Sequence, residues 1–237
     1  MEGLAKYTEG VVMEKYYGKK AIYQLSKTAN NSYFTGRAWT TEEESPIYLA
    51  YRQSYISYGK NFQVMMALRD LIGEEKINAI LKSITDRYRE HVEFSATTLE
   101  FLEELYKVTP VEYHTLIDDW FKRVITYHLS IEKVRHRTLE DGRFEIILQV
   151  EAGRFETNTN GKEQAIEINE PIQIGLFEKH PGQVGTDGGI IYLQPHTIRE
   201  NNQEIRLVVD QLPQYVGIDP FGTRVDENLI DNTVKVE

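Results

Sequence analysis

The stretch Thr126-Tyr127-His128-Leu129-Ser130-Ile131 is where the apolar pattern of this 237-residue chain changes its period. Tyr127, Leu129 and Ile131 alternate with polar neighbours, which is typical of a strand with one buried face. The residues before it, from Thr109 to Val124, repeat apolar and aromatic positions every three or four residues, as an amphipathic helix does. We therefore predict an α+β protein with a helical unit over residues 1–125 and a β unit over residues 126–237.

Upstream of this stretch the pattern predicts a series of helices separated by loops. The first expected helix ends at Tyr17, before Gly18, and a short one follows over residues 20–27. Two more run from residue 61 to Gly73 and from Glu74 to Tyr88. The last two begin after an N-cap at Ser95 and after a capping box at Thr109-Pro110-Val111-Glu112. Thr28–Gly36 is polar and predicts a loop. The acidic segment Thr40–Pro46 predicts a solvated loop in preference to a cation site.

Downstream, six or seven short alternating segments predict a β-sandwich of the immunoglobulin-like kind. Asp141-Gly142 marks a hairpin turn, and Tyr215–Ile218 is the last expected strand. Among the acids that follow, turn formation is favoured over a calcium cluster. These acids are Asp219, Asp226 and Asp231.

Composition excludes several classes of function. The net charge of −10 repels phosphate backbones, so we expect no nucleic-acid partner. The absence of cysteine removes thiol catalysis, disulfides and thiolate metal sites. No apolar run approaches the roughly 18 residues of a membrane span, and the first residues lack the features of a signal peptide. We expect a soluble fragment, and its compartment is left open.

The helix at the start of the chain carries two acids on one face. Glu2 and Glu9 are seven residues apart, almost two helical turns, so their carboxylates point the same way at about 10.5 Å along the axis. This spacing suits a metal ligand with a second acid behind it. It equally suits two solvated glutamates, which are the commoner case on a surface helix.

The residues Glu2-Gly3-Leu4-Ala5, with Tyr7 and Glu9, resemble the N-E-G-[FWL]-A-x-Y-x-E helix of the aminopeptidase N-like zinc metallopeptidases, the gluzincins. The resemblance implies that Glu2 is a zinc ligand and that Glu9 supports the metal site. The family's other two ligands and its general base belong to an H-E-x-x-H motif on the preceding helix. None of the six histidines forms such a pair. We therefore expect the C-terminal part of a metallopeptidase, cut just after its catalytic motif.

A second match lies at Tyr58-Gly59-Lys60, which resembles the family's Y-x-K-G element, with Asn61 where the family has glycine. The resemblance assigns to Tyr58 the hydroxyl that stabilises the oxyanion when a peptide carbonyl is attacked. A phenol suits this role because it is protonated at neutral pH and can donate a hydrogen bond. Without the family, packing would be the expected role for one tyrosine among 15.

The chain's ending, from Gln214 to Asn232, resembles bacterial proteins that join an ABC-type permease to an aminopeptidase-like part. The implied parent is a zinc-dependent peptidase of peptide substrates, associated with a membrane permease. Because one carboxylate cannot hold zinc tightly, we expect the isolated chain to bind no zinc tightly and to be inactive. It should also expose an apolar surface that invites self-association. The alternative is a non-enzymatic interaction or docking module beside a membrane transporter.

Overall fold

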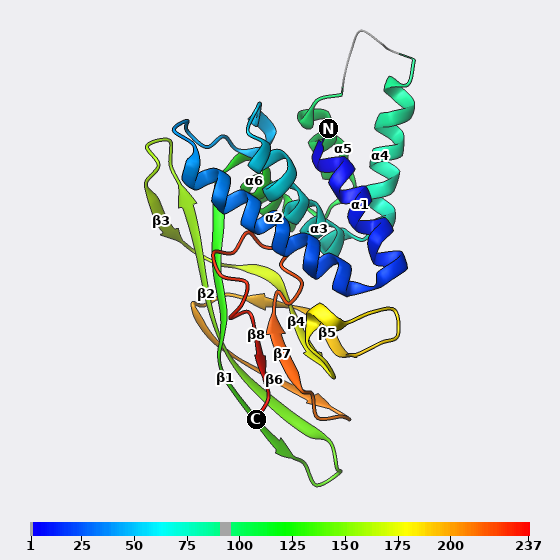
Figure 1. Cartoon of the computed structure of the whole chain (residues 1–237), viewed down its shortest axis with the longest axis vertical. Coiled ribbons are helices and arrows are strands. Elements are labelled where there is room, and N and C mark those ends of the chain that lie inside the picture. The colour runs from blue at the N-terminus through cyan, green and yellow to red at the C-terminus, as the bar shows by residue number, and fades with distance from the viewer. Residues whose placement is uncertain (1, 91–95) are drawn as a thin grey trace.

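The computed structural model describes residues 2–90 and 96–237, apart from the side chain of Glu2. Within those ranges the helices occupy the first half of the chain and the strands occupy the second, so the predicted α+β class is confirmed. Figure 1 shows the helices gathered at one end of the molecule and the sheets at the other, with β1 and β2 extending along its length.

The helical half closely follows the predicted apolar periodicity. Its described elements are α1 (Glu2–Tyr17), α2 (Lys19–Trp39), the 3-10 turn η1 (Ile47–Leu49), the π-helix η2 (Tyr55–Lys60), α3 (Asn61–Ile72), α4 (Glu74–Tyr88), α5 (Thr98–Val108), the 3-10 turn η3 (Val111–Tyr113) and α6 (His114–Lys122). Gly18 and Gly73 follow α1 and α3 at φ values of 76° and 91°. Glycine adopts this left-handed region without a steric penalty, so both predicted stops are confirmed.

The polar segment Thr28–Gly36 is helical, so the predicted loop is wrong. It belongs to α2, which continues without a break to Trp39. Its inner face meets partners from distant parts of the chain: the Asn30 amide donates to the Asp226 carbonyl at 2.7 Å, and Tyr33 is fully buried. These tertiary contacts outweigh the weak helix propensity of the polar residues.

The start of α5 is capped, but not by the residue that the sequence suggested. Ser95, the predicted N-cap, lies outside the described residues. Thr97 forms a capping box with Glu100, each side chain accepting from the other residue's backbone N–H. The box predicted at Thr109 is wrong, because the Thr109 hydroxyl donates to the Leu105 carbonyl and η3 starts without a side-chain cap.

The second half forms two antiparallel sheets of four strands each among the described residues. The strands are β1 (Ile125–Thr138), β2 (Phe144–Thr157), β3 (Glu163–Ile166), β4 (Glu170–Phe177), β5 (Ile190–Ile198), β6 (Asn202–Val209), β7 (Tyr215–Ile218) and β8 (Thr233–Lys235). In one sheet β2 pairs with β1 on one side and with β3 and β6 on the other, and the second sheet has the order β5-β4-β7-β8. The predicted hairpin turn lies between β1 and β2, with Gly142 at φ 86°.

Two apolar clusters form the core. One lies between the sheets and contains residues of both, such as Leu148 of β2 and Ile174 of β4. The sheets therefore face each other across a shared core, while the immunoglobulin-like topology stays a prediction. The other cluster fills the helical half, but it includes Phe177, Val184 and Phe221 from the β half. The two halves are thus packed together by apolar side chains.

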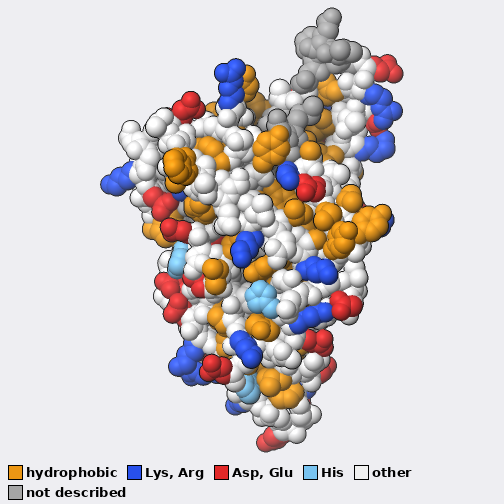
Figure 2. All heavy atoms as spheres, viewed as in Figure 1, with side chains coloured by type: hydrophobic (Ala, Val, Ile, Leu, Met, Phe, Trp, Pro, Cys, Tyr) orange, Lys and Arg blue, Asp and Glu red, His pale blue; other side chains and the backbone are white. Residues whose placement is uncertain are grey.

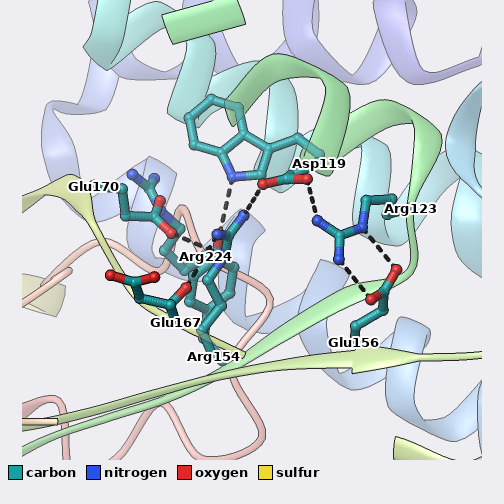
Figure 3. Close-up of polar contacts among 9 residues, drawn as sticks. Asp119, Arg123, Arg154, Glu156, Glu167, Glu170 and Arg224 are labelled. Atoms are coloured by element: carbon teal, nitrogen blue, oxygen red, sulfur yellow. Dashed lines mark hydrogen bonds and ion pairs between the residues drawn. The ribbon is translucent and has the colours of Figure 1, made fainter. Parts of the chain in front are cut away.

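A chain of buried charges also crosses the junction between the two halves. Figure 3 shows Arg154 of β2 between two acids, with its guanidinium 2.6 Å from Asp119 of α6 and 3.4 Å from Glu170 of β4. Arg224 pairs with the other oxygen of Glu170 at 3.0 Å. Arg123 joins Asp119 to Glu156 at the edge of this group. Each charge has an opposite partner, so the network fixes the sheets against α6.

Candidate functional site

The structure describes the two acids of the predicted metal site unequally. The backbone of Glu2 opens α1, but its side chain lies outside the described residues. Glu9 is exposed, and its carboxylate pairs with the Lys6 amino group at 2.6 Å. Within the described part of the chain, Glu9 therefore sits in a solvated pair on the helix surface.

The face of α1 that carries Glu9 is uncovered by the described part of the chain. The buried face of this helix is formed by Gly3, Tyr7 and Gly10. At about 100° per residue, Glu9 projects well away from that face, on the same side as Val12, Met13 and Tyr16. These three apolar side chains are 47%, 36% and 70% exposed, and Figure 2 shows orange side chains on the surface of the helical end. Glu9 therefore lies within an exposed apolar face.

Tyr58 lies on a short π-helix, η2, which leads directly into α3. Its side chain is 44% exposed, while Ile56, Gly59 and Lys60 of the same element are buried. A π-helix is a rare element that occurs frequently at functional sites, because its extra residue redirects the side chains around it. Tyr58 is therefore a partly exposed side chain on an element whose neighbouring residues are buried.

Glycines allow the neighbouring helices to approach this π-helix and its flank closely. A Cβ placed on Gly3 of α1 would lie 2.2 Å from the Asn61 side chain, and one on Gly36 of α2 would lie 2.3 Å from Tyr55. A Cβ on Gly59 would lie 2.8 Å from the Ala29 carbonyl oxygen of α2. The start of α1, immediately after Glu2, therefore packs one helical turn beyond Tyr58.

Behind Tyr58 lies a buried charged group that the sequence did not indicate. The Lys60 amino group is 3.3 Å from the Glu44 carboxylate, which also accepts from the Tyr33 hydroxyl at 2.6 Å and pairs with Arg37 at 3.0 Å. Burial lowers the pKa of Lys60, and Glu44 opposes this shift. Burial also raises the pKa of Tyr55, beside this group, to about 12. We call Tyr33, Arg37, Glu44 and Lys60 the Lys60 cluster.

The acidic segment Thr40–Pro46 is a loop, as predicted, and its residues 41–43 are exposed, but the side chain of Glu44 is not solvated. Glu44, in this segment, has a side chain only 7% exposed because three donors from α2 and η2 surround it. One available signal was Lys60 itself, a charged residue directly before the apolar run that begins at Phe62. Nothing in the pattern identified Glu44 as its partner.

Two other polar regions of the described chain have their charges and hydrogen bonds matched within the fold. A hollow of roughly 480 Å³ lies beside Asp119, Arg123 and Arg154, but those charges are already matched in the junction network. Asp219 and Asp226 are buried acceptors of backbone N–H groups, which is the role of turn-forming acids. Both regions serve the fold.

The described residues do not form a complete metal centre. No group of three or more histidine, cysteine or acidic side chains is placed to hold a metal ion in residues 2–90 and 96–237, the side chain of Glu2 not included. A zinc site normally takes three or four protein ligands. The described side chains therefore do not by themselves supply the ligands of the zinc that the family resemblance implies. In the same described ranges no helix has both the length and the apolar character required to cross a membrane.

Comparison with known proteins gives no further guide to this site. The chain matches no protein-family model, and no curated protein matches it at the level of significance required.

Proposed function

We propose that this chain is the C-terminal part of a gluzincin-type zinc metallopeptidase and supplies Glu2 and Tyr58 to its active site. One observation carries the proposal: Gly3, the residue after Glu2, packs on Asn61, one helical turn beyond Tyr58. The two motif matches, separated by 56 positions in the sequence, thus belong to adjoining segments. The rest of the zinc site would come from residues that precede Met1.

Tyr58 is the residue of this chain to which a chemical role is assigned. Its hydroxyl would donate a hydrogen bond to the oxyanion that forms when a peptide carbonyl is attacked, an interaction that strengthens in the transition state. In such enzymes the zinc ion lowers the pKa of a bound water. Tyr58 is partly exposed and lies on a packed π-helix, which suits a group that must meet a substrate in a fixed direction.

The uncovered face of α1 supports the same proposal. The exposed apolar side chains on this face are costly to leave in water, and such a surface suits a helix that brings the remaining zinc ligands against Glu2. Glu9 would orient that contact or remain a surface acid paired with Lys6. Association with a membrane permease and self-association through this face belong to the proposal as well.

The test compares this chain with a longer chain that includes the residues encoded before Met1. We expect zinc-dependent peptidase turnover from the longer chain only. Glu2→Gln should abolish it, and Tyr58→Phe should lower kcat by about 100-fold or more, as removal of an oxyanion donor does. Tyr51→Phe is the matched control, because Tyr51 is an exposed tyrosine outside the motif.

Two outcomes would contradict the proposal in different ways. Zinc-dependent turnover by the 237-residue chain alone, lost in Glu2→Ala, would show that the chain is sufficient for catalysis. A preceding segment without H-E-x-x-H, together with an inactive longer chain, would instead favour the non-enzymatic docking module.

A further inference from the structure

The π-helix η2 separates its side chains into an accessible group and a buried group. Tyr58 projects outward, whereas Tyr55, Ile56, Gly59 and Lys60 are buried. An i→i+5 turn has less favourable geometry than an α-helical turn, so it persists where the surrounding contacts require it. The contacts that fix the register of this π turn therefore also decide where Tyr58 points.

Lys60 makes the strongest specific contact of the buried group. Its side chain is about 2% exposed, its amino group is 3.3 Å from Glu44, and it lies over the Tyr33 ring at 5.2 Å from the centroid. Burying an ammonium group without such partners costs much free energy, so Lys60 is stable only where its amino group reaches Glu44.

Glu44 is itself held in place, so it serves as a fixed point. Tyr33 and Arg37, both on α2, bind its carboxylate at 2.6 and 3.0 Å. The Lys60 cluster therefore ties the end of η2 to the middle of α2, and Gly59 reinforces this by lying against the α2 backbone.

A change of register would break this tie. If the π turn relaxed to an α turn, each following side chain would rotate by about 100° relative to the preceding ones. Lys60 could then face Glu44 only if Tyr58 changed its direction. Tyr58 and Lys60 are two positions apart on the same element, so fixing the position of Lys60 also fixes the direction of Tyr58.

We propose that the Lys60–Glu44 ion pair is a positioning pair that holds the π-helix in register and thereby aims the Tyr58 hydroxyl. The catalytic meaning of this inference rests on the function proposed above, since Tyr58 is the group being aimed. Lys60 and Glu44 act through Tyr58 and do not contact the substrate themselves.

The experiment uses the full 237-residue chain and two variants, Lys60→Met and Glu44→Gln. Lys60→Met keeps the length of the side chain and removes its charge. Glu44→Gln is the milder change, because the amide oxygen can still accept a hydrogen bond from Tyr33 or Lys60. It keeps the test decisive if Lys60→Met fails to fold. Ile77→Val, a buried change in α4, is the control for global loss of stability.

Two readouts are local to the site and need neither zinc nor peptidase activity. Hydrogen exchange of the amides of residues 55–60 should accelerate by about tenfold or more in both variants. Nitration of Tyr58 by tetranitromethane, mapped by mass spectrometry and expressed relative to Tyr51, should change in the same variants. Ile77→Val should leave both values at those of the wild type.

The inference is overturned if a folded Lys60→Met or Glu44→Gln protein keeps its exchange at residues 55–60 within about twofold of wild type with Tyr58 nitration unchanged. It is also overturned if Ile77→Val produces the same changes, since the effect would then follow global stability. An inactive longer chain with the expected local changes would reject the peptidase and keep the positioning pair. An active longer chain whose variants show no local changes would keep the peptidase and reject the positioning pair.

Discussion

Asp226 ties the C-terminal segment of the chain to β1. Its two carboxylate oxygens accept hydrogen bonds from the backbone N–H groups of Leu129 and Asn228, each at 3.1 Å, and the residue is fully buried. Burial raises the pKa of this carboxyl to about 7, since the hydrogen bonds compensate the loss of water only in part. A residue that the sequence marked only as a turn former is therefore a buried titrating group.

This burial predicts a dependence of stability on pH. Because the folded-state pKa lies above the usual value of 3.8, folding takes up a proton at intermediate pH. The free energy of unfolding should then fall as the pH rises through about 4 to 7, by up to about 1.4 kcal/mol per pH unit for this group. Urea unfolding of wild type and Asp226→Asn at pH 5, 6 and 7 measures the two slopes.

Comparing the pH dependence of the unfolding free energy in wild type and in Asp226→Asn separates Asp226 from the other titrating groups. Asp219, whose pKa burial raises to about 6, contributes in both proteins. Asp226→Asn should therefore show a shallower fall between pH 5 and 7, whatever its absolute stability. Equal slopes in the two proteins would show that Asp226 does not take up a proton on folding.

Among elements, α2 departs most from its predicted form, and Asn30 shows why. Its amide nitrogen donates to the Asp226 carbonyl at 2.7 Å, and its amide oxygen accepts from Gln63 of α3 at 3.2 Å. A composition of Asn, Ser and Thr favours a loop when each residue is taken alone. The helix persists because its inner face is buried and Asn30 on that face finds hydrogen-bond partners inside the protein.

We expect Asn30→Ala to lower the free energy of unfolding by about 1–3 kcal/mol, because it leaves buried polar partners unmatched. The adjacent Asn31 is exposed and supplies a matched control. Asn31→Ala should be neutral or slightly stabilising, since alanine has the higher helix propensity. Chemical denaturation followed by circular dichroism gives both values. A similar loss in the two variants would show that the Asn30 contacts do not stabilise α2.

At the scale of the whole molecule, the helices and sheets are joined by apolar packing and by the junction network of Figure 3. Arg154 is central to that network because it lies between Asp119 and Glu170, and Glu170 is fully buried. Removing one member of a buried ionic group leaves an uncompensated charge, which costs more than the group contributes when intact.

Arg154→Met should therefore destabilise the protein by about 3–5 kcal/mol. Arg137, whose guanidinium pairs with Glu145 at the surface, is the control, and Arg137→Met should cost at most about 1 kcal/mol. Equilibrium unfolding in guanidinium chloride, followed by both tryptophan fluorescence and circular dichroism, measures these losses. Arg154→Met with wild-type stability would show that the network does not hold the two halves together.

The sequence alone was sufficient where the determinant is local. Periodicity placed the change from helix to strand near residue 125, and the glycines marked the ends of α1 and α3. The helices α3 and α4 lie where they were predicted, because a 3.6-residue period reports directly on a buried face. The division into two units, the zinc ligand Glu2 and the oxyanion donor Tyr58 stay predictions of the sequence and its resemblance.

The tertiary structure decided what depends on residues far apart in the chain. The helical state of Thr28–Gly36, the burial of Glu44 and the junction network depend on contacts between distant residues. Glu44 and Lys60 are 16 positions apart, and Asn30 and Asp226 are 196 positions apart. A polar residue has the same local propensity whether it faces water or a buried partner, so its pattern cannot distinguish a loop from a satisfied interior position. Only the tertiary packing determines whether such a residue faces water in a loop or a buried partner in a helix.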